Sequence, residues 1–186
     1  MCMRVSSLAL AGIPIFAGYY SKDAILEGAI AAHSGVGTFA FACGILAAFL
    51  TAFYSWRLLI LTFHGKPRAD QHTMEHVHES PAVMLVPLLV LSVGAIATGF
   101  TFAPYFIGDM QAQFWNGAIF NLPAKHMVEA LHHAPHWVPT VAKITAVSGI
   151  LLAVLLYGFL PHVPGRIAAA VPGLYRFLLN KWYFDE

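Results

Sequence analysis

Long apolar stretches are the feature that most constrains how this chain can fold. Residues 81–108 form a run of 28 positions without a charged side chain, and about 20 consecutive apolar residues are enough for a helix to cross the hydrocarbon core of a bilayer. With 59% hydrophobic and 10% charged residues overall, the chain lies far from the soluble average of roughly 25% charged residues. The sequence therefore predicts an integral membrane protein.

Four stretches are long enough and apolar enough for helices that cross a membrane. The predicted fold class is all-α, a polytopic membrane protein with four transmembrane helices of which the first is discontinuous. The expected segments are a broken helix over 1–34, a helix over 35–63, a His-rich loop over 64–80, a helix over 81–104, an interfacial loop region with short helices over 105–142, a helix over 143–160 and a final segment over 161–186.

The basic residues orient these spans, because Lys and Arg accumulate in short cytoplasmic loops. With four spans, Lys125 and Lys143 fall on one side of the membrane. Seven others fall on the opposite side, namely Arg4, Arg57, Lys66, Arg68, Arg166, Arg176 and Lys181. We therefore expect 64–80 and 161–186 to be cytoplasmic and 105–142 to be periplasmic.

Charge and cysteine content exclude several classes of function. The formal net charge is +1 and no basic stripe is present, so nucleic acid is excluded as a main partner and membrane lipid is expected instead. Cys2 and Cys43 are too few and too far apart for a disulfide framework or an iron–sulfur site. No glycine-rich phosphate loop or dinucleotide fingerprint occurs. We expect no cofactor and no redox centre in this chain.

The pair Lys22 and Asp23 stands in apolar surroundings, where ionisable groups are costly and are by default a functional hypothesis. Pro14 removes a backbone donor upstream, and Gly12 and Gly18 flank it, which predicts a helix break at membrane depth. A partly desolvated lysine at such a break, with a carboxylate beside it, could exchange protons with a chain of water molecules. Glu27 lies four residues after Asp23 and shares its helical face.

A structural explanation of the same lysine is also open. If the first helix starts at Val5 and runs straight, Lys22 lies about 25 Å along it at 1.5 Å per residue. That position is near the far interface, where a lysine simply extends its amine into the headgroups. Arg57 is better explained as an interfacial anchor of this kind than as part of a pathway.

Two groups of histidines raise the question of a metal. His72 and His76 have the i, i+4 spacing that can bind zinc on a helix, but no cysteine joins them, and a solvated loop is the preferred interpretation. The same holds for the second group, which consists of His126, His132, His133 and His136. We therefore predict no metal site.

Several sequence blocks resemble a known family. These are SLALAGIP at 7–14, FAGYYSKDAIL at 16–26, FYSWR at 53–57 with FHGKP at 63–67, HESP at 78–81 and NKWYFDE at 180–186. Together they closely resemble the large antiporter-like subunit L of bacterial NADH:quinone oxidoreductase, respiratory complex I. The resemblance covers essentially the whole chain, and its last block distinguishes subunit L from its shorter paralogues.

The resemblance implies roles for particular residues. In that family the corresponding helix is broken in mid-membrane and its lysine ends the subunit's proton path, so Lys22 is implied as the relay with Asp23 as its neighbour. Ile15 departs from the pattern, because many members have a second proline there. The family's earlier helices, lateral helix and final anchor are absent. We therefore expect a C-terminal fragment that does not translocate protons alone.

The function implied by the resemblance is that of a membrane-arm subunit in an enzyme complex of the bacterial inner membrane. It would take part in proton translocation coupled to electron transfer from NADH to quinone. FMN and iron–sulfur clusters would be held by other subunits, and the partners would be other membrane-arm subunits, especially the adjacent antiporter-like one. The alternatives are the large subunit of a multisubunit cation/proton antiporter, against which the tail block argues, and a non-catalytic membrane assembly fragment.

Overall fold

The computed structural model describes residues 2–65, 69–119 and 135–184, and every regular element in these ranges is a helix. This confirms the all-α class. The elements are α1 (Cys2–Ala11), α2 (Ala17–Ala31), α3 (Gly35–Phe63), α4 (Gln71–Glu75), α5 (Ala82–Phe106), α6 (Gln111–Trp115), α8 (Trp137–Val154), the π-helical turn η1 (Leu155–Phe159), α9 (Val163–Ala170), α10 (Pro172–Leu179) and the 3-10 turn η2 (Lys181–Tyr183).

Three helical stretches in the described ranges are long and apolar enough to cross a membrane: α3, α5, and α8 continued by η1. They contain 29, 25 and 23 residues, against the roughly 20 that a bilayer requires. The first expected span is present as two shorter helices, α1 and α2, separated by residues 12–16. A multi-pass helical membrane protein follows from these lengths and compositions.

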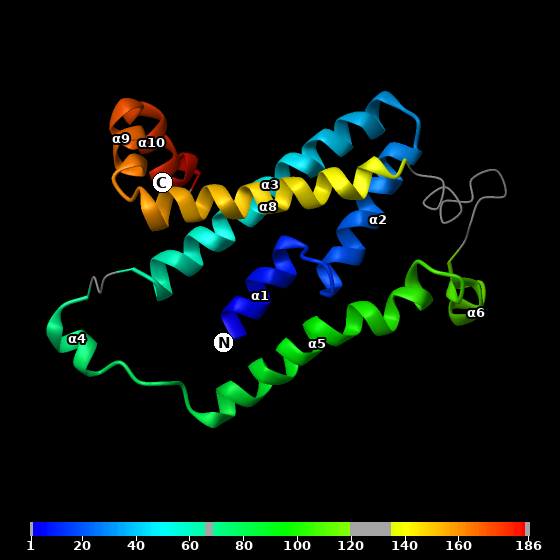
Figure 1. Cartoon of the computed structure of the whole chain (residues 1–186), viewed down its shortest axis with the longest axis horizontal. Coiled ribbons are helices and arrows are strands. Elements are labelled where there is room, and N and C mark those ends of the chain that lie inside the picture. The colour runs from blue at the N-terminus through cyan, green and yellow to red at the C-terminus, as the bar shows by residue number, and fades with distance from the viewer. Residues whose placement is uncertain (1, 66–68, 120–134, 185–186) are drawn as a thin grey trace.

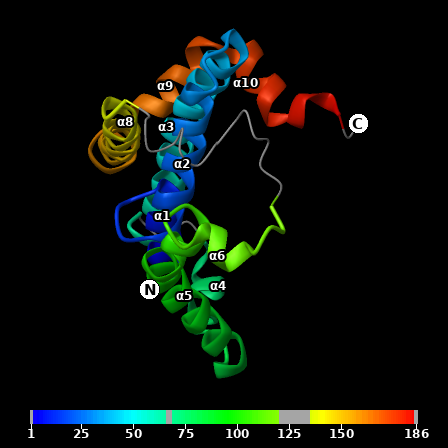
Figure 2. The same cartoon turned by 90° about the vertical axis from the view of Figure 1, so that its right-hand side faces the viewer.

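The helices are arranged around the α3 and α8 pair. Figure 1 shows α3 and α8 side by side, with α1 and α2 between that pair and α5. In Figure 2 α8 is seen nearly end-on beside α2 and α3, while α5 lies below them. Arg4 at the start of α1 donates to His64 Nε2 just past the end of α3 at 3.4 Å. Since α2 leads directly through Ser34 into α3, the α1 and α2 pair runs antiparallel to α3.

Small side chains allow the helices to approach closely. One buried cluster consists of three alanines, Ala11 at the end of α1, Ala52 on α3 and Ala146 on α8. Nearby, a Cβ atom added at Gly149 would lie 2.6 Å from the Phe49 carbonyl oxygen, so the backbones of α8 and α3 touch there. Such contacts between small residues are the usual means of packing helices in lipid, where apolar burial between helices gains little.

Some element limits differ from the sequence expectation. α8 begins at Trp137 rather than 143, because Pro139 falls in the first turn, where a missing N–H has no intrahelical acceptor to lose. α5 continues through Pro104 to Phe106. The segment over 64–80, expected to be a loop, contains the short helix α4, whereas α6 lies in the 105–142 region, where short helices are expected.

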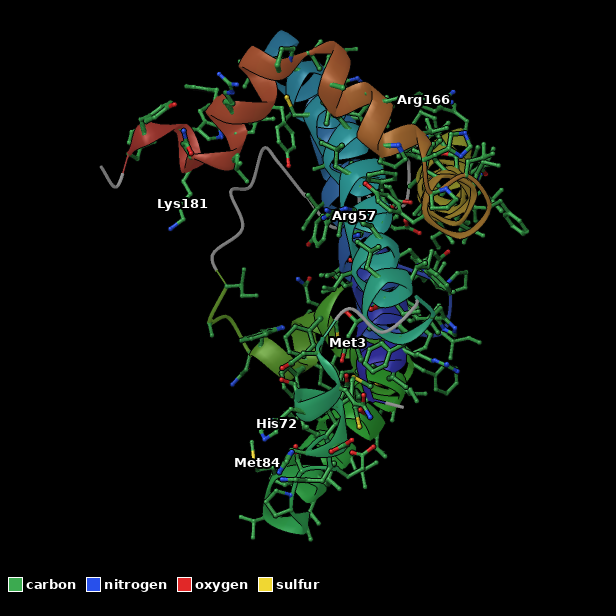
Figure 3. The ribbon with its side chains drawn as sticks, turned by 90° about the vertical axis from the view of Figure 1, so that its left-hand side faces the viewer. Met3, Arg57, His72, Met84, Arg166 and Lys181 are labelled. Atoms are coloured by element: carbon green, nitrogen blue, oxygen red, sulfur yellow. The ribbon has the colours of Figure 1, made fainter. Side chains whose placement is uncertain are left out.

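Basic residues gather at one end of the molecule. The end of α3, α4, the start of α5, and α9 lie at the left of Figure 1. Figure 3 looks onto that end and shows Arg57, Arg166, His72 and Lys181 from it. Lys66, Arg68 and Lys125, on which the orientation also rests, lie outside the described residues. The cytoplasmic assignment of this end stays a prediction.

The π-helical turn η1 lies at this same end. The Leu160 N–H donates to the Leu155 carbonyl oxygen at 2.9 Å, which is the i to i+5 pattern of a π-helix. Within the turn, the Tyr157 ring lies 5.3 Å from the Arg57 guanidinium carbon. The contact between cation and ring joins η1 to α3 where the apolar spans end.

Candidate functional site at the helix break

The break between α1 and α2 follows from the position of one proline. In a continuous helix the Leu10 carbonyl would accept a hydrogen bond from the N–H of residue 14, but Pro14 has no N–H. The helix ends at Ala11. Gly12 (φ 76°) and Ile15 (φ 93°) then take left-handed backbone angles before α2 begins at Ala17.

Lys22 satisfies the carbonyl that the proline leaves free. Its Nζ atom donates to the Leu10 carbonyl oxygen at 2.6 Å. The side chain passes directly over Gly12, where an added Cβ atom would lie 3.0 Å from Lys22 Cδ and 3.7 Å from Nζ. Glycine at position 12 therefore supplies both the positive φ angle and the space for the lysine stem.

The two half-helices overlap beside the break. A Cβ atom at Gly18 would collide with the Ala9 carbonyl oxygen, so the first turn of α2 lies against the last turn of α1. On its other side, Gly99 of α5 lies so close to Ala17 that a Cβ atom there would be 2.5 Å from the Ala17 Cα. Backbone contacts on two sides fix the start of α2, and with it the position of Lys22.

Asp23 faces a different neighbour from Lys22. It has Tyr19 as a side-chain hydrogen-bond partner and feels the charge of Lys143 on α8. Lys143 in turn has Tyr19 as a side-chain hydrogen-bond partner, and its Nζ atom lies 5.1 Å from the centre of the Tyr19 ring. In the described part of the chain, Lys22 and Asp23 form no ion pair with each other.

Glu27 completes a stripe along one face of α2. Tyr19, Asp23 and Glu27 follow one another at intervals of four residues, which places them on one face of the helix. The charge of Glu27 also acts on Lys143. This face of α2 therefore presents a hydroxyl and two carboxylates to the lysine of α8.

The sequence identified only half of this arrangement. Lys22 is found at the break, where the spacing of proline and glycine predicted it, and Asp23 is beside it in the chain. Tyr19 and Lys143 were missed as site residues, because Lys143 was counted only as a loop charge. The i, i+4, i+8 stripe on α2 was the available signal that a basic group would face it.

The histidines form no metal centre in the described ranges. No group of three or more His, Cys, Asp or Glu side chains there could hold a metal ion. The rings of His72 and His76 do meet, with centroids 4.6 Å apart, while His76 Nδ1 contacts the His72 carbonyl oxygen at 2.7 Å. His126, His132 and His133 lie outside the described residues.

An apolar cavity lies beyond the opposite face of α2. It has a volume of about 630 Å³ and is formed by α2, α5 and α6, with Tyr20, Gly99 and Phe114 among its walls. Neither Lys22 nor Asp23 lines it. A molecule held there would meet apolar groups rather than the charged pair.

Comparison with known proteins identifies a family that matches this chain and several chains of similar sequence. The family described as NADH:quinone oxidoreductase/Mrp antiporter, TM matches residues 1–51, which include the break and Lys22. NADH-quinone oxidoreductase subunit L of Rhodobacter capsulatus is 38% identical over 234 aligned positions, covering 96% of this chain and 32% of that protein.

Two further relatives give the same result. NADH-ubiquinone oxidoreductase chain 5 of Dictyostelium citrinum is 39% identical over 99% of this chain and 28% of its own length. Subunit L of Neisseria meningitidis serogroup A is 33% identical over 100% of this chain and 31% of its own length. The chain thus spans about a third of the length of these relatives.

Proposed function

Because this chain belongs to the family of NADH-quinone oxidoreductase subunit L and NADH-ubiquinone oxidoreductase chain 5, we propose that it serves in the membrane arm of such an enzyme. In this role it takes part in proton translocation coupled to electron transfer from NADH to quinone. Lys22 is the protonatable relay, and Asp23 is the carboxylate beside it.

The observation that carries this proposal is the hydrogen bond from Lys22 Nζ to the Leu10 carbonyl oxygen across the helix break. Irregular backbone at membrane depth is tolerated where it is covered by protein or lines water. An ammonium held by a single carbonyl keeps two N–H bonds for water molecules, so it can pass a proton to a chain of waters and take another back. A lysine in the interior of an unbroken helix would have no such free carbonyl.

The relay needs an external driving force. Moving one elementary charge across the membrane costs about 2.3 kcal/mol per 100 mV, and we propose that this energy comes from outside the chain. The electron-transfer reaction would occur in other subunits that carry FMN and iron–sulfur clusters. We propose that the adjacent antiporter-like subunit transmits the coupling and that the assembly lies in the bacterial inner membrane, surrounded by lipid.

A second candidate function is the large subunit of a multisubunit cation/proton antiporter. The matched family also includes Mrp antiporters, and its match covers the residues that hold the break. Copurification separates the two functions. A tagged chromosomal copy that brings down flavin, iron–sulfur signals and NADH-dependent quinone reduction supports the first. A stable assembly without redox centres supports the antiporter, and stable insertion without any partner supports the non-catalytic fragment.

The relay itself is tested by replacing Lys22 with Ala in the full-length subunit. Proton pumping into reconstituted vesicles is measured against NADH oxidation, with Lys181→Ala as the control because Lys181 lies exposed in η2. We expect Lys22→Ala to lower the number of protons pumped per electron while the complex stays assembled, and Lys181→Ala to leave it unchanged. An unchanged ratio in Lys22→Ala would refute the relay role.

A further inference from the structure

Lys22 and Asp23 are neighbours in the chain but face different groups in the folded structure. Successive residues of an α-helix point about 100° apart, and here that angle separates two environments. Lys22 reaches back to α1, where it meets the Leu10 carbonyl oxygen. Asp23 faces α8 with Tyr19 and Lys143. The lysine of the relay thus lacks the counter-charge that its sequence neighbour could supply.

Lys143 is the basic residue on the side that Asp23 faces, and Tyr19 lies between the two groups. Its Nζ atom lies 5.1 Å from the centre of the Tyr19 ring, and the Tyr19 side chain is a hydrogen-bond partner of both Lys143 and Asp23. A tyrosine hydroxyl can accept from an ammonium and donate to a carboxylate at the same time. Tyr19 therefore links the Asp23 carboxylate on α2 to the Lys143 ammonium on α8.

The packing of α2 on α8 holds these groups level with one another. Leu26, one turn after Asp23, is buried in a cluster with Ala142 and Val138 of α8. Ala142 immediately precedes Lys143. On the far side of Leu26, a Cβ atom added at Gly44 of α3 would lie 2.7 Å from its Cδ2 atom. Leu26 therefore fits between two helices and fixes how far α2 can slide along α8.

We propose that Lys143 is a positioning residue of the relay, which holds the Asp23 carboxylate on the α8 side through Tyr19 and so withholds it from Lys22. This inference rests on the proposed function of Lys22. Glu27, one turn further along α2, adds a second carboxylate to the field of Lys143 and helps to keep its ammonium on this face. Lys143 acts through Asp23 and does not itself carry the translocated proton.

The arrangement gives Asp23 two alternative partners and Lys22 two states. While Asp23 stays with Tyr19 and Lys143, the Lys22 ammonium lacks a counter-charge and gives up its proton more readily. One N–H bond breaks, a water molecule takes the proton, and a neutral amine remains hydrogen-bonded at the break. If Asp23 turns to Lys22, the ammonium is stabilised and the proton is retained. The rest of the enzyme then needs only to favour one of the two partners of Asp23, either Lys22 or the pair of Tyr19 and Lys143.

The test compares two replacements of Lys143 in the full-length subunit of the assembled enzyme. Lys143→Gln removes the charge, whereas Lys143→Arg keeps a charge that cannot be titrated in the physiological range. Protons pumped per electron are measured in vesicles, with Lys181→Gln as the matched control. We expect Lys143→Gln to lower the ratio to the level of Lys22→Ala and Lys143→Arg to restore it. The positioning role requires only a positive charge at position 143. Loss of pumping in both Lys143→Gln and Lys143→Arg would therefore overturn it.

Tyr19→Phe provides a milder version of the same test. It keeps the ring under the Lys143 amine and removes only the hydroxyl, and Tyr20→Phe is its control. Should Lys143→Gln fail to assemble, Tyr19→Phe carries the test alone. We expect pumping to fall in Tyr19→Phe and to remain unchanged in Tyr20→Phe. Full pumping in Tyr19→Phe would overturn the proposed bridge.

A double-mutant cycle tests whether Lys143 acts through Asp23. If it does, adding Lys143→Gln to Asp23→Asn lowers pumping no further than Asp23→Asn alone, while independent, multiplied losses would contradict the inference. Failure here is distinguishable from failure of the proposed function. Normal pumping in Lys22→Ala overturns the relay itself, whereas reduced pumping in Lys22→Ala with normal pumping in Lys143→Gln overturns only the role of Lys143.

Discussion

Replacing Gly12 with Ala tests the geometry of the break most directly. The φ angle of 76° at this position is in the left-handed region, which costs an L-residue about 1–2 kcal/mol. The new Cβ atom would also lie 3.0 Å from Lys22 Cδ, so the lysine stem must shift, and we expect this shift to break its hydrogen bond to the Leu10 carbonyl. A hydrogen bond from a charged donor contributes about 1.5 kcal/mol at the lower end of its range, which suits a partly exposed side chain. The expected total loss is therefore about 2.5–3.5 kcal/mol.

Gly117→Ala is the matched control for this change. Gly117 has a similar φ angle of 81°, but nothing lies within 4 Å of an added Cβ atom, so only the backbone strain of about 1–2 kcal/mol applies. The unfolding free energy of the purified chain is measured by titrating sodium dodecyl sulfate into mixed micelles while following tryptophan fluorescence. We expect Gly12→Ala to lose about 1.5 kcal/mol more than Gly117→Ala, because only it displaces Lys22.

The contribution of Lys22 can be isolated in the same assay. If the extra loss comes from the hydrogen bond between Lys22 and Leu10, Lys22→Ala costs less in a Gly12→Ala background than in the native chain. Equal losses for the two glycine variants, or fully additive losses for Gly12→Ala and Lys22→Ala, would refute the reasoning.

Two further predictions concern the packing and capping of the long helices. Gly149→Ala brings a Cβ atom within 2.6 Å of the Phe49 carbonyl oxygen and should cost about 1–3 kcal/mol in the same unfolding assay. Gly94→Ala, in a helix interior with open space around it, should be neutral or stabilising, so equal losses would contradict the close packing. Ser34 Oγ accepts from the Gly37 N–H at 3.0 Å at the start of α3. Ser34→Ala should cost about 1 kcal/mol, but Ser34→Gly only a few tenths, and similar losses in both would argue against a capping role.

Local chemistry explains which parts of the fold the sequence could predict. The helical class follows from uncharged runs such as 81–108, since runs of that length match the thickness of a bilayer. The break follows from Pro14, because the loss of a backbone donor acts on the residues immediately around it. The same local reasoning placed the start of the last span too late. The region over 105–142 was expected to be a loop, although a proline in the first turn, such as Pro139, is compatible with a helix.

The stripe on α2 indicates that a basic group faces it, but which residue supplies that group depends on contacts between distant parts of the chain. Tyr19 and Lys143 are 124 positions apart in the sequence, and they meet only because Leu26 packs against Ala142 and Val138. The sequence places Asp23 beside Lys22 but does not show which group each side chain contacts. A helix turns by about 100° per residue, so the two side chains point in different directions. Lys22 meets the helix break, whereas Asp23 faces α8.

The π-helical turn at 155–159 has a consequence for how the chain leaves the membrane. A π turn contains more residues than an α turn, so the loss of one residue would tighten it toward the α-helical rotation of about 100° per residue. Deleting one residue from this turn would hardly change the apolar character of the helix. It would nevertheless move the Tyr157 ring away from the Arg57 guanidinium and change the direction in which α9 and α10 leave the helix bundle. The exit direction is therefore encoded by the number of residues in the turn, so a deletion there would alter it more than most substitutions.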